Sequence, residues 1–157
     1  MASQQDIKRR IRSVQNTRKI TKAMKKVAGR LRLDLAQYRE LEAFAQFGSD
    51  LDRATQQALT RGEKMVATLN QPQYDPWPTE EQVAAIYAGI HGYLDEIPTE
   101  QVQRFQDELR EFLRSEGEVY KQIRESGDLS DELVEKLNAA LEKFKNNFNI
   151  QEETTTV

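Results

Sequence analysis

Apolar residues recur at steps of three and four along most of this 157-residue chain. The first series begins near Ile7 and continues across many helical turns. Its members are Ile7, Ile11, Val14, Ile20, Met24, Val27, Leu31, Leu35, Tyr38, Leu41 and Ala45. This spacing places apolar side chains on one face of an α-helix. The sequence therefore predicts one long N-terminal helix, with Gly29 as its weak point because glycine lowers helix propensity.

Capping residues and prolines divide the rest of the chain into shorter helices. Ser49, with an acid three residues later, predicts a second helix that runs to about Asn70. Prolines exclude a helix interior from residues 71–78, which we expect to form an extended linker. Thr79 begins a Thr-Glu-Glu-Gln capping box and predicts a third helix.

Three more helices are expected after the turn around Gly92 and Pro98. Thr99 is expected to cap the first of them, and a shorter helix around Val119 should end near Gly127. Ser130 is expected to start the last helix. Its apolar face consists of Leu133, Leu137, Leu141, Phe144 and Phe148.

No stretch shows the two-residue alternation of branched apolar residues that is typical of strands. We therefore predict an all-α fold, a helical bundle of about five to six helices with a long N-terminal helix. The chain length allows one compact core with an appendage, and not two independent domains.

Charge is distributed unevenly along the chain. Residues 1–32 contain eleven Lys or Arg and one acid, which is a formal charge of +10. Residues 33–157 contain twelve Lys or Arg and twenty-five acids, which is a formal charge of −13. The basic arm could attract nucleic acid or an anionic membrane surface, and it is also typical of an organelle-targeting peptide. The helical period continues unbroken into the acidic region, which instead favours a helix that packs on another helix.

The composition excludes several classes of chemistry. The chain has no Cys and one His, so a zinc-type ligand set is excluded, and no glycine-rich phosphate loop is present. No apolar run approaches the roughly 18 residues of a membrane span. His91 lies beside Gly92 at an expected helix end, where we interpret it as a surface or capping residue. We expect neither enzymatic activity nor a cofactor or metal.

The acid pair Asp95-Glu96 differs from the other paired acids because it lies in a turn. It is flanked by Leu94, Ile97 and Pro98. An acidic tip with apolar neighbours could dock on a partner, although composition alone fits a plain turn equally well.

Two stretches of the chain resemble different subunits of F-type ATP synthase. Residues 1–24, which include DIKRRIRSV at 6–14 and KITKAM at 19–24, resemble the N-terminus of the gamma subunit. In that family this segment is a helix of the central rotor shaft. From residue 22 onward, the chain resembles the C-terminal domain of the alpha subunit, with LRLDLAQYRELEAFAQFGSDLD at 31–52 as the most specific stretch and GYLDEIP at 92–98 as another.

The resemblance implies a gamma/alpha chimera with three parts. These are a basic helical arm over residues 1–24, an alpha-type bundle over residues 25–148, and a frayed tail over residues 149–157. The nucleotide-binding domain of the alpha subunit is not among them, so ATP hydrolysis does not carry over. The implied role is a structural and interaction fragment of the ATP synthase head.

The implied partners are the beta and gamma subunits. Six residues are the expected interface residues: Asp95, Glu96 and Ile97 on the bundle, and Arg9, Arg12 and Met24 on the arm. If assembled, the chain would be cytoplasmic and peripheral to the membrane. A binder of nucleic acid or anionic surfaces, and a designed or recombined helical protein without retained function, are the alternatives.

The arm is also expected to need a covering surface, because a gamma-like helix without its coiled-coil mate would expose Ile7, Ile11, Val14 and Ile20. Exposure costs about 25 cal/mol per Å² of apolar area. Two arms could pair and form a homo-oligomer through the N-terminal helix, or the arm could dock on an acidic bundle face.

Overall fold

A computed structural model describes residues 5, 7, 21–47, 50–70 and 77–150 of the chain. These residues form six α-helices, one short 3-10 helix and no strand, which confirms the predicted all-α fold. The helices are α2 (Lys22–Ala45), α3 (Arg53–Leu69), α4 (Thr79–Ile90), α5 (Val102–Glu116), α6 (Glu118–Ser126) and α7 (Asp131–Asn147), and the 3-10 helix η1 (Thr99–Gln101) precedes α5.

The helix α2 begins at Lys22, so the prediction of one unbroken helix from Ile7 to Ala45 is wrong. Thr21 has an extended backbone, and its hydroxyl accepts a hydrogen bond from the Met24 amide at 3.2 Å. The Ala23 amide donates to the Gly127 carbonyl at 3.1 Å. Both bonds satisfy donors that a helix N-terminus leaves without intrahelical partners, so they favour a start here. The helix then runs through Gly29 without a break.

Two other predicted helix starts also differ from the structure. The predicted cap Ser49 lies outside the described residues, and Asp52 is the N-cap of α3. Pro78 occupies the N-cap position of α4, so Thr79 is a helical residue and the predicted capping box does not form. Proline is compatible with this position because the φ of −53° lies within the range that its ring fixes. Of the predicted linker, Trp77 is described and is buried.

The C-terminal helices follow the predicted order closely. The predicted cap Thr99 instead begins η1, and α5 starts three residues later. Gly117 and Gly127 take positive φ angles of 70° and 64° at the two ends of α6, a conformation that glycine adopts without strain. Ser130 caps α7, as predicted, because its hydroxyl accepts from the Leu133 amide at 3.2 Å.

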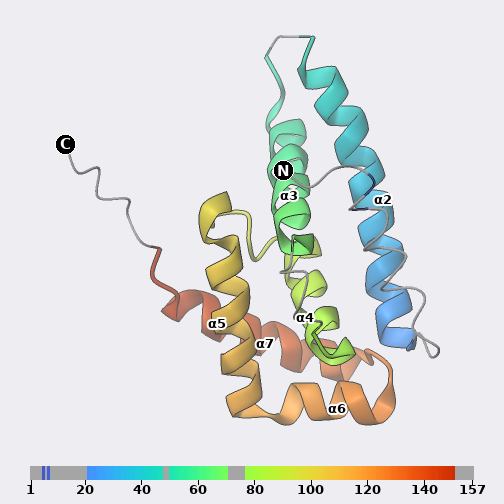
Figure 1. Cartoon of the computed structure of the whole chain (residues 1–157), viewed down its shortest axis with the longest axis vertical. Coiled ribbons are helices and arrows are strands. Elements are labelled where there is room, and N and C mark those ends of the chain that lie inside the picture. Colours follow the sequence, from blue (N-terminus) through green and yellow to red (C-terminus); the bar gives the residue numbers. More distant parts are fainter. Residues whose placement is uncertain (1–4, 6, 8–20, 48–49, 71–76, 151–157) are drawn as a thin grey trace.

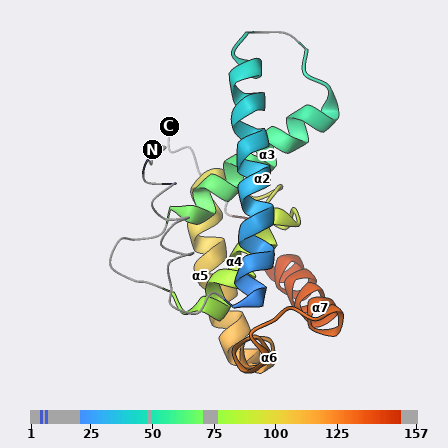
Figure 2. The ribbon, with the colours of Figure 1, turned by 90° about the vertical axis from the view of Figure 1, so that its right-hand side faces the viewer.

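The six helices pack around one apolar core. α2 and α3 form an antiparallel hairpin whose far end, between residues 45 and 53, extends beyond the rest of the bundle (Figures 1 and 2). α4 packs against α2 and α3, and α6 joins α5 to α7 at the opposite end. The largest fully buried side chains include those of Leu94, Phe105, Leu109, Leu113, Leu137 and Leu141.

Ile7 belongs to the same core and is 7% exposed. For Ile7 this burial agrees with the expectation that the stripe needs a covering surface, and the cover is the bundle of its own chain. Ile11, Val14 and Ile20 lie outside the described residues.

Candidate interface at the acidic turn

The turn after α4 carries the acid pair that the sequence singled out. α4 ends at Ile90, His91 is its C-cap, and Gly92 has a φ of 82° that turns the chain away from the helix axis. Leu94 and Ile97 point into the core and are 0% and 3% exposed. The turn is therefore anchored by its apolar residues, and its surface is formed by the acids between them.

Each acid of the turn makes an ion pair with another helix. Asp95 accepts a hydrogen bond from Arg61 of α3, with Oδ2 2.8 Å from Nη2. Glu96 lies 3.1 Å from the Lys145 amine of α7, measured from its Oε2, and its side chain is 76% exposed. The two contacts hold the turn between α3 and α7 and leave the Glu96 carboxylate accessible to solvent.

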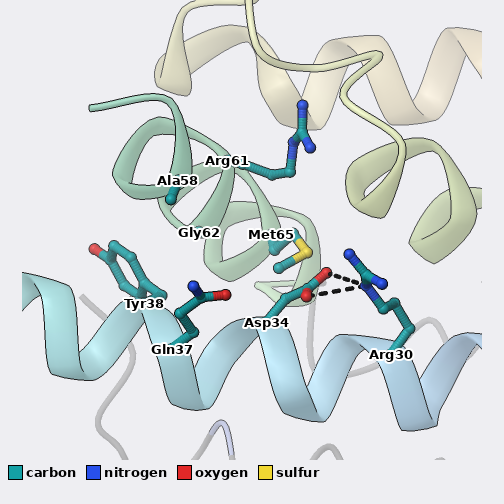
Figure 3. A pocket seen from close by; sticks show the side chains of 8 residues that line it. All are labelled: Arg30, Asp34, Gln37, Tyr38, Ala58, Arg61, Gly62 and Met65. Carbon is teal, nitrogen blue, oxygen red and sulfur yellow. Dashed lines mark hydrogen bonds and ion pairs between the residues drawn. The ribbon is translucent and has the colours of Figure 1, made fainter. Parts of the chain in front are cut away.

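A polar hollow adjoins this turn between α2 and α3. It has a volume of about 100 Å³, and Arg30, Asp34, Gln37, Tyr38, Ala58, Arg61, Gly62 and Met65 line it (Figure 3). Arg30 donates to Asp34 along α2 at 3.2 Å, and Arg61 points away from α2. A Cβ atom at Gly62 would lie 2.2 Å from the Tyr38 ring, so glycine is needed where the two helices approach.

The charges around the hollow influence one another. The hydrogen bond to Asp95 raises the pKa of Arg61. Desolvation lowers the pKa of His91, and the guanidinium groups of Arg30 and Arg61 lower it further. His91 is exposed and stacks on Tyr87 with ring centroids 4.0 Å apart, which confirms a surface and capping position.

A second ion cluster connects α4 to α5. Glu81 is 4% exposed and accepts from Arg114 Nε at 2.6 Å and from Arg110 Nε at 2.8 Å. Burial raises the pKa of Glu81, but the hydrogen bonds from the two arginines outweigh this effect and hold it below the usual range. Arg110 also lies 4.0 Å from the centre of the Trp77 ring. The side chains of Glu81 and Arg110 are 5% and 11% exposed, although that of Arg114 is 52% exposed, so we assign the cluster mainly to stability.

Two of the six expected interface residues lie at the surface of the bundle, and two are buried. Asp95 and Glu96 present carboxylates, whereas Ile97 and Met24 are 3% and 2% exposed. Burial against their own chain leaves Ile97 and Met24 unavailable for direct contact in this fold. Arg9 and Arg12 lie outside the described residues.

Sequence reasoning missed several residues that shape this surface. Arg61 and Lys145 lie 34 and 49 residues from their acidic partners Asp95 and Glu96, a separation without a sequence signal. Sequence reasoning also missed the exposed large apolar residues Leu33, Phe44 and Phe47. For Leu33 and Phe44, the only indication in the sequence was that they do not belong to the apolar stripe of α2.

The arrangement places paired charges at the surface of the bundle. Among residues 5, 7, 21–47, 50–70 and 77–150, no group of three or more His, Cys, Asp or Glu could hold a metal ion. Of the charged residues that line the hollow, Arg30 and Asp34 pair with each other, and Arg61 pairs with Asp95 of the turn. None of the described helices is long and apolar enough to cross a membrane.

Comparison with known proteins identifies relatives for most of the chain. Residues 21–144 match the family of the ATP synthase alpha/beta chain, C-terminal domain. ATP synthase subunit alpha of Lactobacillus helveticus is 58% identical over 128 residues, which are 81% of this chain and 25% of that protein. The corresponding subunit of Syntrophomonas wolfei is 54% identical over 129 residues, or 82% of this chain and 26% of the relative. The chain thus spans about a quarter of the length of these relatives.

Proposed function

We propose a structural, non-catalytic role in the head of an ATP synthase, starting from the premise that this chain belongs to the family of the ATP synthase alpha/beta chain, C-terminal domain. The family match over residues 21–144 covers the whole helical bundle up to Phe144 and carries this proposal. The bundle holds its polar groups in ion pairs between helices, which suits a rigid part of a larger assembly. The partners that we propose from the resemblance of the sequence are the beta and gamma subunits.

The contact surface that we favour is the acidic turn after α4. Asp95 and Glu96 are fixed by Arg61 and Lys145, so their carboxylates are presented with little loss of side-chain freedom on binding. Glu96 in particular keeps most of its side chain in solvent. A partner with a basic surface would complement this turn, as expected for a basic shaft helix.

The arm over residues 1–24 is the gamma-like part of the proposal. The family match begins at residue 21 and α2 begins at Lys22, and both support a boundary close to these residues. We propose that Arg9 and Arg12 contribute basic contacts of the kind made by a rotor shaft. The burial of Ile7 supports docking of the arm's beginning on its own bundle. In an assembled synthase the chain would lie on the cytoplasmic side, peripheral to the membrane.

The test measures binding of the full chain to purified bacterial beta and gamma subunits by fluorescence anisotropy. The double variant Asp95→Asn/Glu96→Gln should weaken binding about ten-fold or more, because two charges are removed from the interface centre. Glu125→Gln changes an exposed acid on α6 and serves as the matched control, with unchanged binding expected. Equal binding by the double variant would contradict the assignment of the turn, and no binding by the unmodified chain would contradict the proposed role.

The same preparation separates this proposal from a nucleic-acid or anionic-surface function. Binding to DNA or to anionic vesicles that exceeds binding to the subunits, and that falls steeply with salt, would favour the basic arm as the functional element. The proposed role predicts the reverse order of affinities at physiological salt.

A further inference from the structure

The outer face of α2 exposes large apolar side chains. Leu33 and Phe44 of α2 are 70% and 66% exposed, and Phe47, in the turn that follows the helix, is 89% exposed. Leu33 and Phe44 are eleven residues apart, which is about three helical turns, so they lie on the same side of the helix. This side faces away from the other helices, along the edge of the molecule in Figure 1. Within the described part of the chain, no element covers it.

Small residues on the same face would let another helix approach closely. Gly29 and Ala36 precede and follow Leu33 at helical spacing, and both are exposed. A Cβ atom at Gly29 would have no contact within 4 Å, so packing inside the chain does not require glycine there. Glycine weakens a helix interior, and close approach by a partner helix is a reason to retain it.

Charge along α2 indicates which partner fits this face. Residues 22–32 contain five Lys or Arg and no acid, whereas residues 40–52 contain four acids and no Lys or Arg. On the exposed face itself, Lys22 and Lys26 lie toward one end and Glu40 toward the other, with Leu33 between them. A second helix with the same distribution of charge, running antiparallel, would place its acidic end beside the basic end of α2 and its basic end beside the acidic end of α2.

We propose that two copies of this chain associate through the outer faces of α2, antiparallel and related by a two-fold axis at Leu33. With Leu33 opposite its equivalent, Lys26 faces Glu40 of the second copy and Lys22 faces Phe44 of the second copy. Lys26 already binds Asp128 and the Leu129 carbonyl, both at 2.8 Å, and its ammonium has a third donor available. A two-fold axis makes the same contacts twice, as in most homodimers.

The association predicts a specific pattern of disulfide cross-linking in the full chain. The sequence has no Cys, so a single introduced thiol is the only one present. Leu33→Cys places two thiols at the two-fold axis, whereas Phe47→Cys places them beyond the opposite ends of the two helices, more than about 30 Å apart. Under mild oxidation, Leu33→Cys should form the cross-linked dimer about ten-fold faster or more, because disulfides need short Cα distances. Equal rates, or faster reaction of the more exposed Phe47→Cys, would overturn the antiparallel arrangement.

A charge exchange tests the choice of a second copy as the partner. Glu40→Lys should weaken the dimer about ten-fold in sedimentation equilibrium, because each Lys26 then faces a lysine. Glu42→Lys, which makes the same change half a turn away from Leu33, should leave it unchanged. Lys26→Glu should also weaken self-association, and its mixture with Glu40→Lys should restore a dimer, because each introduced charge then faces its opposite. Circular dichroism verifies that each variant is folded, and a monomeric unmodified chain at all concentrations would overturn the proposal.

The test of self-association is independent of the proposed role in an ATP synthase. The contacts with beta and gamma subunits are assigned to the turn at Asp95 and Glu96, and no variant used here changes that turn. If another subunit, and not a second copy, covers the α2 face, Leu33→Cys will form no disulfide between two copies. The assignment of a second copy as the partner would then be wrong.

Discussion

Arg61 Nη2 lies 2.8 Å from Asp95 Oδ2 and joins α3 to the turn after α4. The two side chains are 41% and 26% exposed, so solvent screens much of their attraction. The contact fixes the position of the turn more than it stabilises the fold. It also explains why an acidic turn with inward-pointing apolar residues keeps one defined conformation at the surface.

Asp95→Asn should therefore have a small effect on stability. We expect the free energy of unfolding to fall by about 0.5 to 1 kcal/mol, because the pair is partly exposed. Urea denaturation followed by circular dichroism measures this change. A loss of several kcal/mol would mean that the pair is part of the stabilising core, which would contradict its assignment as a positioning contact.

Glu81→Gln should be far more destabilising. Its carboxylate accepts a hydrogen bond from Arg110, whose side chain is 11% exposed, so the variant replaces the charged partner of a largely buried guanidinium with a neutral amide. Loss of one partner of a buried pair costs about 3 kcal/mol or more. The matched control is Glu80→Gln, whose partner Arg124 is 64% exposed and whose loss should cost less than about 1 kcal/mol. Equal losses for both variants would contradict the structure of the Glu81 cluster.

The same cluster predicts a loss of stability in acid. The pKa of Glu81 in the folded chain lies below its ordinary value of 4.5, because hydrogen bonds from Arg114 and Arg110 outweigh burial. The unfolded state therefore takes up this proton first as the pH falls. Stability is fully present above about pH 4.5 and is lost as the pH falls through the lower, folded pKa. Thermal unfolding of the chain and of Glu81→Gln across this range should show a flatter acid limb for the variant.

Two glycine variants should change stability in opposite directions. Gly29→Ala adds a Cβ with no contact within 4 Å and should stabilise the isolated chain by about 1 kcal/mol, since alanine favours the helix. Gly62→Ala places a Cβ 2.2 Å from the Tyr38 ring and should destabilise it by about 1 to 3 kcal/mol. Urea unfolding at low protein concentration measures both. The same sign for both variants would contradict the packing of α2 on α3.

The fold class could be predicted because apolar spacing reports which face of each helix is buried. The α7 stripe of Leu133, Leu137 and Leu141 is buried as predicted, and Ser130 caps that helix. Local signals failed where a contact distant in sequence decides the structure. The long predicted helix is interrupted at Thr21. Two residues later, the Ala23 amide donates a hydrogen bond to the carbonyl of Gly127, which lies more than 100 residues away in the sequence.

The candidate site could be predicted only in part. The acids Asp95 and Glu96 were recognised from their position in a turn, and the structure places both at the surface. Burial of Ile97 could not be inferred, because an apolar residue beside a turn can point either way. Glu81 was interpreted as part of a capping box. Its real partners, Arg110 and Arg114, could not be recognised from the sequence because they lie 29 and 33 residues away.

A structural role in the ATP synthase head is tested by native mass spectrometry of the full chain mixed with purified bacterial beta and gamma subunits. We expect complexes that contain this chain with these subunits at physiological salt, together with no ATP hydrolysis by the chain alone. A chain that enters no complex with either subunit, or that hydrolyses ATP by itself, would contradict a structural role in the ATP synthase head.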